Sequence, residues 1–126
     1  MAKETSERKR ILVVDDDAQV GRLFKRILEE GGHTVLLAGS GGAALDRLQK
    51  ETVNLLVLDL AMPDTDGFEV LKFVRERAPG LRVLVISGFL DGRLLEPAKF
   101  LGAHATLNKT DAPERLLETV NALLRW

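Results

Sequence analysis

The sequence predicts a doubly wound α/β fold built on a five-stranded parallel sheet, and two alternating patterns carry this prediction. Short runs rich in Val, Leu and Ile recur with little polar alternation, as in strands that are covered on both faces. Stretches in which apolar residues recur at helical spacing separate these runs. Five repeats of this alternation imply right-handed crossovers and helices on both faces of one sheet. The strands are expected at RILVV, HTVLLA, LLVLD, RVLVIS and ATLN.

The first helix is expected between the first two strands. Asp17 precedes its apolar pattern at the N-cap position, where a carboxylate satisfies free backbone N–H groups and the helix dipole. The glycines of EEGGH, residues 29–33, supply the stop that helices commonly have just past their ends. A second helix is expected from Gly41 to Lys50, with Ser40 as its N-cap.

Three further helices are expected, and proline interrupts one of them. Phe68, Leu71 and Val74 mark the third helix. The fourth, within LDGRLLEPAKFLG, has Pro97 in its middle, which removes a backbone donor and clashes with the preceding turn. We therefore expect this helix to be short or kinked. The last helix follows Pro113 and carries Leu116, Leu117, Val120, Leu123 and Leu124 on one face.

The composition indicates one soluble domain and excludes several kinds of site. A chain of 126 residues, of which 45% are hydrophobic and 29% charged, can bury a single core. The net charge of -1 gives no reason to expect nucleic acid or an anionic membrane as a direct partner. The absence of cysteine excludes a disulfide scaffold and a thiolate metal site.

The polar composition of the first residues sets the expected start of the folded domain. The first ten residues, MAKETSERKR, are polar and lack the apolar segment of a signal peptide. No apolar run is long enough to span a bilayer, so a cytoplasmic location is expected. Residues 1–8 are expected to be a disordered lead-in, and residues 9–126 the folded domain.

Polar side chains are placed at the carboxyl ends of four predicted strands. Asp15 and Asp16 follow the first strand, and Asp59 ends the third. Ser87 ends the fourth strand, and Lys109 follows the fifth. Ligands of doubly wound sheets bind outside the carboxyl ends of the strands. We therefore expect three carboxylates, a hydroxyl and an ammonium to meet at one edge of the sheet.

This set of side chains suits phosphoryl chemistry with a hard cation. Carboxylates without Cys or His are typical of Mg²⁺ sites, and the cation relieves the repulsion between the acids. The ammonium of Lys109 and the hydroxyl of Ser87 suit phosphoryl oxygens. A carboxylate can itself be the nucleophile in phosphoryl transfer, so chemistry at Asp59, with its charge neutralised by Mg²⁺ and Lys109, is consistent with this set. His33 and His104 lie outside this set and are expected at the surface.

Four segments, in this order and spacing, resemble the receiver domain of two-component response regulators of the chemotaxis-regulator-like type: ILVVDDD, LLVLDLAMPDTDG, VLVISG and LGAHATLNK. The resemblance covers Arg10 to Leu124 and implies the flavodoxin-like strand order 2-1-3-4-5. It implies Mg²⁺-dependent phosphorylation of Asp59 by a sensor histidine kinase or a phosphotransfer protein. It also implies that the fourth helix, fifth strand and fifth helix form an output surface for a downstream effector or for a homodimer.

The resemblance assigns roles to individual residues. Asp16 matches a direct Mg²⁺ ligand, and Asp15 matches an acid that acts mainly through water. Asp59 and the backbone carbonyl of Ala61 complete the metal set. Ser87 matches the hydroxyl that turns toward the phosphoryl group. On this assignment the domain is no enzyme beyond its own phosphorylation and dephosphorylation.

Two positions depart from the family pattern around the matching lysine, Lys109. The family usually follows this lysine with proline, but Thr110 stands here, so a trans peptide bond and a rearranged loop are expected. Thr106 occupies the switch position, where many members have Tyr, Phe or His. The coupling is then muted or passes to another residue, for which Phe89 and Phe100 are the candidates.

Two other functions stay open at this point. The departures at Thr106 and Thr110 motivate an interaction domain that keeps the fold without being phosphorylated. It would bind Mg²⁺ weakly and would not respond to a beryllofluoride mimic of the phosphoryl group. A Mg²⁺-dependent phosphatase with Asp59 as its nucleophile is disfavoured, because such enzymes typically need a second acid where Ala61 stands.

Overall fold

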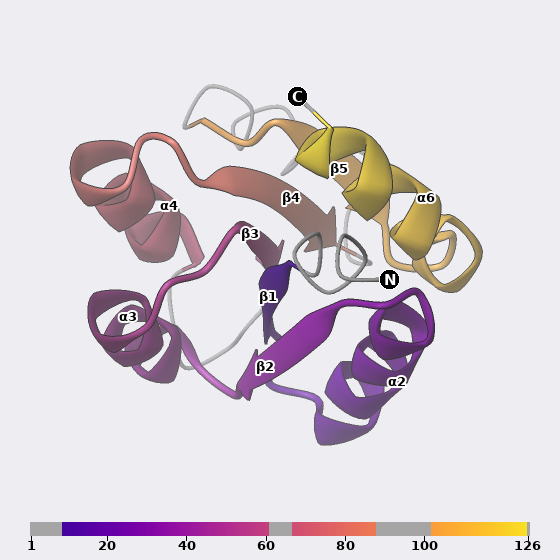
Figure 1. Cartoon of the computed structure of the whole chain (residues 1–126). Coiled ribbons are helices and arrows are strands. Elements are labelled where there is room, and N and C mark those ends of the chain that lie inside the picture. Colours follow the sequence, from indigo (N-terminus) through magenta and orange to yellow (C-terminus); the bar gives the residue numbers. More distant parts are fainter. Residues whose placement is uncertain (1–8, 61–66, 88–101, 126) are drawn as a thin grey trace.

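The computed structural model describes residues 9–60, 67–87 and 102–125, in which five strands form one parallel sheet with helices on both faces (Figure 1). The strand order is β2-β1-β3-β4-β5, which confirms the predicted order. Four strands coincide with the predicted runs, and β2 begins one residue later than its run. The strands are β1 (Arg10–Val14), β2 (Thr34–Ala38), β3 (Leu55–Asp59), β4 (Arg82–Ser87) and β5 (Ala105–Asn108).

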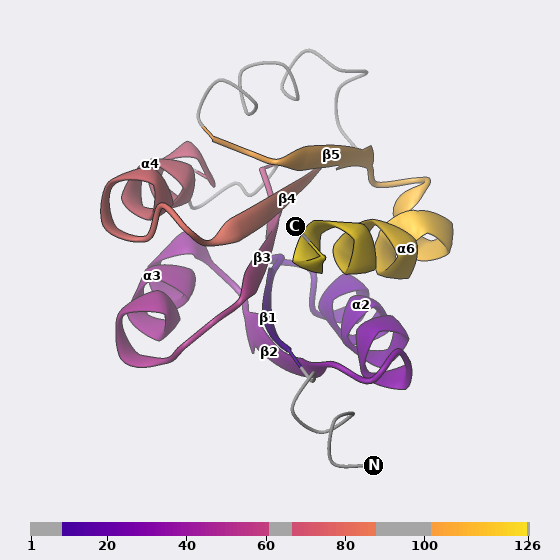
Figure 2. The same cartoon turned by 45° about the horizontal axis from the view of Figure 1, so that its top comes forward.

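The helices of the described residues lie in two pairs, one on each face of the sheet. Figures 1 and 2 show α3 and α4 on one face and α2 and α6 on the other. No helix in the described ranges is long and apolar enough to cross a membrane. The predicted fourth helix around Pro97 and the lead-in of residues 1–8 lie outside the described residues. The helices are α2 (Ala18–Glu30), α3 (Gly41–Lys50), α4 (Gly67–Arg77) and α6 (Ala112–Leu124).

Both predicted N-caps are confirmed. One carboxylate oxygen of Asp17 accepts hydrogen bonds from the N–H groups of Gln19 at 2.9 Å and Val20 at 3.3 Å. The hydroxyl of Ser40 accepts from the N–H of Ala43 at 3.1 Å. Each cap satisfies backbone donors that the first turn of a helix leaves without partners. Asp17 is therefore occupied by α2, and only the two acids before it are available to the sheet edge.

The core consists of two apolar layers, one on each face of the sheet. Successive side chains of a strand point to opposite faces, so a continuous apolar run fills both layers at once. This explains why the strands show no polar alternation in the sequence. Beneath α3 and α4 lie Leu12, Val14, Leu56, Leu58, Val83 and Val85, and beneath α2 and α6 lie Ile11, Val13, Leu55, Val57, Leu84 and Ile86.

The register of the strands brings their polar ends together. β1 runs beside β3, and Asp15 follows β1 at the level at which Asp59 ends β3. Between β4 and β5, Ser87 is paired with Asn108. The N–H of Lys109 then donates to the carbonyl of Ser87 at 3.0 Å, which continues the pairing by one residue. These polar residues therefore occupy neighbouring positions along one edge.

Candidate functional site

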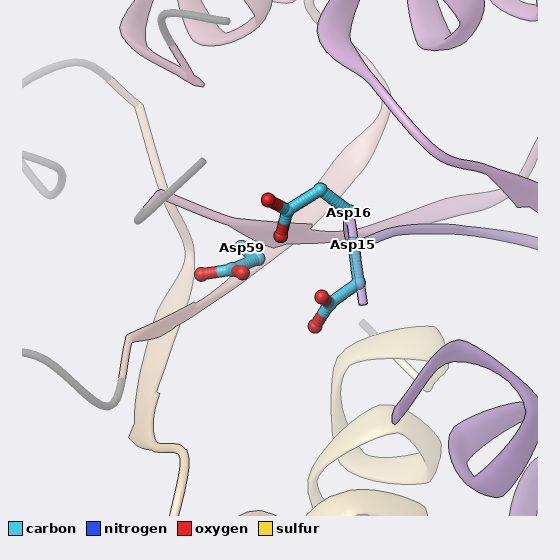
Figure 3. Close-up of side chains that lie close together, drawn as sticks. All are labelled: Asp15, Asp16 and Asp59. Atoms are coloured by element: carbon cyan, nitrogen blue, oxygen red, sulfur yellow. The ribbon is translucent and has the colours of Figure 1, made fainter. Parts of the chain in front are cut away.

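Three carboxylates meet at the carboxyl edge of the sheet. Asp15, Asp16 and Asp59 each offer an oxygen, and these atoms lie within 4.8 Å of one another (Figure 3). Asp15 and Asp59 are only 5% and 2% exposed, whereas Asp16 is exposed. The acids that the sequence places at strand ends are thus brought together, with two of them buried and one facing solvent.

Lys109 supplies a positive charge to both buried acids. Its Nζ donates to Oδ2 of Asp59 at 3.1 Å and lies 3.0 Å from Oδ2 of Asp15. The contact with Asp15 is an ion pair without the angles of a hydrogen bond. Within the described part of the chain, this buried oxygen therefore has no hydrogen-bond donor. Among the described residues one cation faces three acids, so this cluster carries more negative than positive charge.

Asn108 closes the loop that follows Lys109. Its Oδ1 accepts from the N–H of Thr110 at 3.1 Å and from the Thr110 hydroxyl at 2.9 Å. Proline could supply neither donor. Every peptide bond of the described residues is trans, as expected for the bond between Lys109 and Thr110. Threonine thus gives the loop two hydrogen bonds of its own, and Lys109 still reaches the acids.

Burial and charge act in opposite directions on this group. Burial raises the pKa of Asp15, and the nearby Asp59 charge adds to the effect. The Asp17 N–H, which donates to Oδ1 of Asp15 at 2.8 Å, and the Lys109 ammonium only partly offset it. Burial alone would lower the pKa of Lys109, but its contacts with Asp15 and Asp59 outweigh burial and raise it. The lysine is therefore charged at neutral pH.

Ser87 and Thr106 lie on the neighbouring strands β4 and β5. Ser87 is 1% exposed and ends β4, the strand beside Asp59. Thr106 is half-buried, and its strand neighbours Ala105 and Leu107 pack into the layer of α2 and α6. Thr106 therefore faces the opposite side of the sheet. The other residues that the resemblance singled out, Ala61, Phe89 and Phe100, lie outside the described residues.

A match to a known protein family identifies the kind of domain that holds this cluster. A family model described as the response regulator receiver domain matches residues 11–121. The chain belongs to this family. Phosphorylation-based two-component signalling is the general function of response regulator receiver domains.

Individual relatives agree with the family match. The response regulator MprA of Mycobacterium avium (strain 104) is 39% identical over 116 residues, which cover 92% of this chain and 51% of MprA. The transcriptional activator protein ExaE of Pseudomonas putida is 37% identical over 116 residues, which cover 90% of this chain and 54% of ExaE. The receiver domain therefore spans about half the length of these two relatives.

A solved structure agrees with the fold. The CheY-like response regulator receiver domain protein of Methanospirillum hungatei JF-1 superposes with a TM-score of 0.87 at 32% identity. The match covers 94% of each chain.

The name of ExaE, in contrast, conflicts with the expectation that nucleic acid is no partner. That expectation used the net charge of this chain alone, and the match covers only 54% of ExaE.

The two histidines, His33 and His104, are less exposed than the sequence predicted. Both were expected at the surface, but both are half-buried and hydrogen-bonded. Nε2 of His33 lies 2.7 Å from Oδ1 of Asn121, which joins the end of α2 to α6. Nδ1 of His104 accepts from the N–H of Val83 at 3.0 Å. No local pattern identifies these contacts, because their partners are 88 and 21 residues away in the chain.

Proposed function

We propose that this receiver domain accepts a phosphoryl group on Asp59 from a sensor histidine kinase or a phosphotransfer protein. The observation that carries the proposal is the buried Asp59 carboxylate, held by the Lys109 ammonium at 3.1 Å beside two further acids. A carboxylate oxygen of Asp59 attacks the phosphorus of a phosphohistidine. The new P–O bond forms as the P–N bond breaks, and the donor imidazole nitrogen takes up a proton.

The acidic cluster fits Mg²⁺, which we include in the proposal. Asp15, Asp16 and Asp59 offer hard oxygen ligands without Cys or His among them, and one buried oxygen of Asp15 has no hydrogen-bond donor in the described residues. The backbone carbonyl of Ala61 belongs to the ligand set that the resemblance implies. Bound Mg²⁺ would neutralise negative charge on the phosphoryl oxygens and on the acids.

The residues on β4 and β5 have positioning roles in this proposal. The ammonium of Lys109 is placed to bind a phosphoryl oxygen on Asp59 in exchange for the carboxylate oxygen that it now contacts. Ser87 offers a hydroxyl from the end of the adjacent strand, and Thr106 lies on β5 beside Val85, two residues before Ser87. A structural change at these residues would be transmitted to β5 and α6. These two elements are the part of the expected output surface that lies in the described residues.

The proposal extends to the partners of the receiver domain. Response regulators interact with sensor kinases and effector domains, and we propose both for this protein. The output surface would bind an effector or a second copy of the domain. We also propose a cytoplasmic location, and no catalytic activity beyond phosphorylation and dephosphorylation of Asp59.

The test is the intact mass of the protein after incubation with a small acyl phosphate and Mg²⁺. The wild type should gain one phosphoryl group, and chelation of the metal should prevent the gain. Asp59→Asn should gain none, whereas Asp46→Asn, which changes an exposed acid of α3, should behave as the wild type. An adduct of unchanged yield in Asp59→Asn would overturn the assignment.

The interaction-domain alternative makes opposite predictions. Its motivation was the departures at Thr106 and Thr110, but Thr110 leaves Lys109 in contact with Asp59, which supports phosphorylation. NMR spectra recorded with beryllofluoride and Mg²⁺ discriminate between the two functions. Shifts along β4 and β5 are expected for a phosphorylated switch, and unchanged spectra for an interaction domain. Steady turnover of a generic phosphomonoester would instead indicate a phosphatase.

A further inference from the structure

His104 supplies a backbone hydrogen-bond partner at the start of β5. Its own N–H donates to the carbonyl of Val83 at 2.8 Å, and its Nδ1 accepts from the N–H of Val83 at 3.0 Å. The regular pairing of β4 with β5 begins only at the next pair, Leu84 with Ala105. The imidazole therefore extends the β4–β5 ladder by one residue, at the end of the sheet opposite the acidic cluster.

Only a neutral imidazole can make this bond. In neutral histidine one ring nitrogen carries a proton and the other accepts, whereas in the imidazolium both nitrogens are donors. Acceptance by Nδ1 assigns the proton of the neutral ring to Nε2. A second proton, on Nδ1, would point a donor at the N–H of Val83. Protonation of His104 and its hydrogen bond to Val83 are therefore mutually exclusive.

The charges around the ring also oppose protonation. In the described part of the chain they are Arg82 of β4, which precedes Val83, and Arg75 of α4, which lines the cavity beside the ring. Burial lowers the pKa of His104, and the Arg82 charge lowers it further. The ring is thus neutral at pH 7, and its proton uptake requires a fall in pH or a change in the local structure.

A cavity beside the ring provides space into which a protonated imidazole can rotate. It has a volume of about 170 Å³ and lies between α4, the start of β4 and the residues before β5. Leu71 and Leu81 form apolar walls, and Arg75, Val83 and His104 line the rest of it together with Val74, Pro79 and Gly102. This volume is enough for several water molecules. The ring can therefore turn away from Val83 and remain hydrated.

We propose that His104 is a pH-sensitive hydrogen-bond switch that holds the start of β5 when neutral and releases it when protonated. β5 has four residues, and in the described sheet it pairs with β4 alone. It carries Thr106 and leads directly into Lys109. Release of its start therefore loosens the strand that positions Lys109 against Asp59. This consequence for phosphorylation rests on the proposed function, whereas the switch itself does not.

The pH window follows from the direction of the shift. Because the pKa of His104 is lower in the folded protein than its ordinary value of 6.5, the unfolded chain takes up the proton first as the pH falls. The stability contributed by the neutral ring is complete above pH 6.5 and is lost as the pH falls toward the lowered pKa. The start of β5 should loosen in the same window.

Hydrogen exchange of the Val83 amide tests the switch. After correction for intrinsic rates, exchange in the wild type should become roughly fivefold faster or more as the pH falls from about 7.5 to about 5, as expected for loss of one hydrogen bond. The ring signals of His104 should titrate over the same range. The amide of Asn54, which donates to the Arg10 carbonyl at the start of β3, serves as the reference. Unchanged relative protection of Val83 across the His104 titration would overturn the proposal.

Two variants separate the acceptor from the titration. Asn places Oδ1 where histidine has Nδ1, so His104→Asn should protect the Val83 amide equally at both pH values. Gln places its oxygen at the ε position, so His104→Gln should lose that protection at both. The same pH dependence in His104→Asn as in the wild type would show that another group is responsible.

A phosphorylation assay then measures the consequence at the acidic cluster. The rate of Asp59 phosphorylation by an acyl phosphate with Mg²⁺, expressed as the ratio of wild type to His104→Asn, should fall several-fold between about pH 7.5 and about pH 5.5. A constant ratio would remove the link from the switch to the cluster. Absence of phosphorylation in every variant would contradict the proposed function, while the Val83 amide would still decide the switch.

Discussion

The ammonium of Lys109 lies 3.1 Å from Oδ2 of Asp59, although the two residues are 50 positions apart in the chain. The contact exists because β3 and β5 flank β4, where Asp59 is paired with Ile86 and Asn108, the residue before Lys109, is paired with Ser87. The same ammonium lies 3.0 Å from Oδ2 of Asp15. One lysine therefore compensates two buried carboxylates that would otherwise repel each other.

We predict that Lys109→Gln destabilises the protein by about 1–3 kcal/mol in the absence of divalent cations, because two buried acids then lose their compensating charge. Mg²⁺ should recover part of this loss by neutralising the same acids. Phosphorylation of Asp59 by an acyl phosphate should be about tenfold slower or more, because a charge that binds a phosphoryl oxygen is missing. Urea unfolding with and without Mg²⁺, together with the phosphorylation rate, measures these effects.

Lys50→Gln is the matched control for this prediction. Lys50 pairs with Asp46 at 3.1 Å, but both side chains are more than 60% exposed, so the pair should contribute less than about 1 kcal/mol. Its removal should change neither the phosphorylation rate nor the response to Mg²⁺. Equal effects of the two substitutions would show that the position of the lysine is unimportant.

We predict that Asp15→Asn stabilises the metal-free protein at neutral pH. Because burial raises the pKa of Asp15 above 3.8, its ordinary value, the folded state favours the protonated carboxyl. The charged form therefore costs stability above the folded pKa, and this cost disappears as the pH falls toward 3.8. The amide keeps an oxygen for the Asp17 N–H. The gain should be about 1 kcal/mol, or a few degrees in Tm, at pH 7.

Thermal unfolding in chelator at a series of pH values checks the Asp15 prediction. The difference between Asp15→Asn and the wild type should shrink as the pH falls toward about 4. Asp46→Asn should show no such convergence, because Asp46 is exposed. A loss of stability in Asp15→Asn at pH 7 would mean that the ion pair with Lys109 outweighs the cost of burial.

The fold was predictable because the three central strands, β1, β3 and β4, are buried on both faces. A continuous apolar run such as LLVLD favours a strand that is covered on both faces, and Asp59 is the first polar residue at the end of that run. The N-caps at Asp17 and Ser40 were predictable for a similar reason, because capping depends on residues three positions away at most. These signals are local, so no tertiary information is needed to find them.

Two of the contacts that the sequence did not reveal depend on tertiary register. Lys109 reaches Asp15 as well as Asp59 because the register of the sheet brings the carboxyl ends of β1, β3 and β5 to one edge. The hydrogen bond from the Val83 N–H to His104 requires His104 to lie beside Val83, one residue before the regular pairing of β4 with β5 begins. Asn108 closing the loop at Thr110 is local, and an Asn two residues before a Thr could have indicated this turn.

We predict that Gly67→Ala destabilises the protein and slows phosphorylation. A Cβ atom at Gly67 would lie 2.9 Å from Cδ2 of Leu60, 3.2 Å from the Leu60 Cα and 3.4 Å from the carbonyl oxygen of Asp59. Backbone cannot give way cheaply, so the start of α4 or the end of β3 must shift. We expect a loss of about 1–3 kcal/mol in unfolding experiments. Since β3 ends in Asp59, the acyl phosphate reaction should also slow.

Gly42→Ala provides the contrast within another helix. A Cβ at this exposed position of α3 would meet only the Ser40 hydroxyl at 4.0 Å. Alanine should therefore stabilise the protein by roughly 0.5–1 kcal/mol through helix propensity and leave phosphorylation unchanged. If Gly67→Ala proved as harmless as Gly42→Ala, the close contact between α4 and the end of β3 would have no energetic weight.

Asp16 and Asp17 are adjacent acids for which we predict opposite effects. Asp16 is exposed and contributes an oxygen to the acidic cluster, and its side chain caps no helix among the described residues. Asp16→Ala should leave metal-free stability within about 0.5 kcal/mol of the wild type, because it removes an exposed charge. It should abolish the rise in Tm on addition of Mg²⁺ and prevent Mg²⁺-dependent phosphorylation. Asp17→Ala should lose about 0.5–2 kcal/mol of stability with the two cap bonds.

Tm measured against Mg²⁺ concentration separates these two roles, because a cation that binds only the folded state raises Tm more as its concentration increases relative to its dissociation constant. The Asp17→Ala curve should lie below that of the wild type and rise in parallel with it. The Asp16→Ala curve should begin near the wild type and stay flat. If Tm rose with Mg²⁺ in parallel in both variants, the cation would not bind at Asp16. Equal loss of phosphorylation in both variants would show that the assignment of Asp16 to the acidic cluster and of Asp17 to the helix cap is wrong.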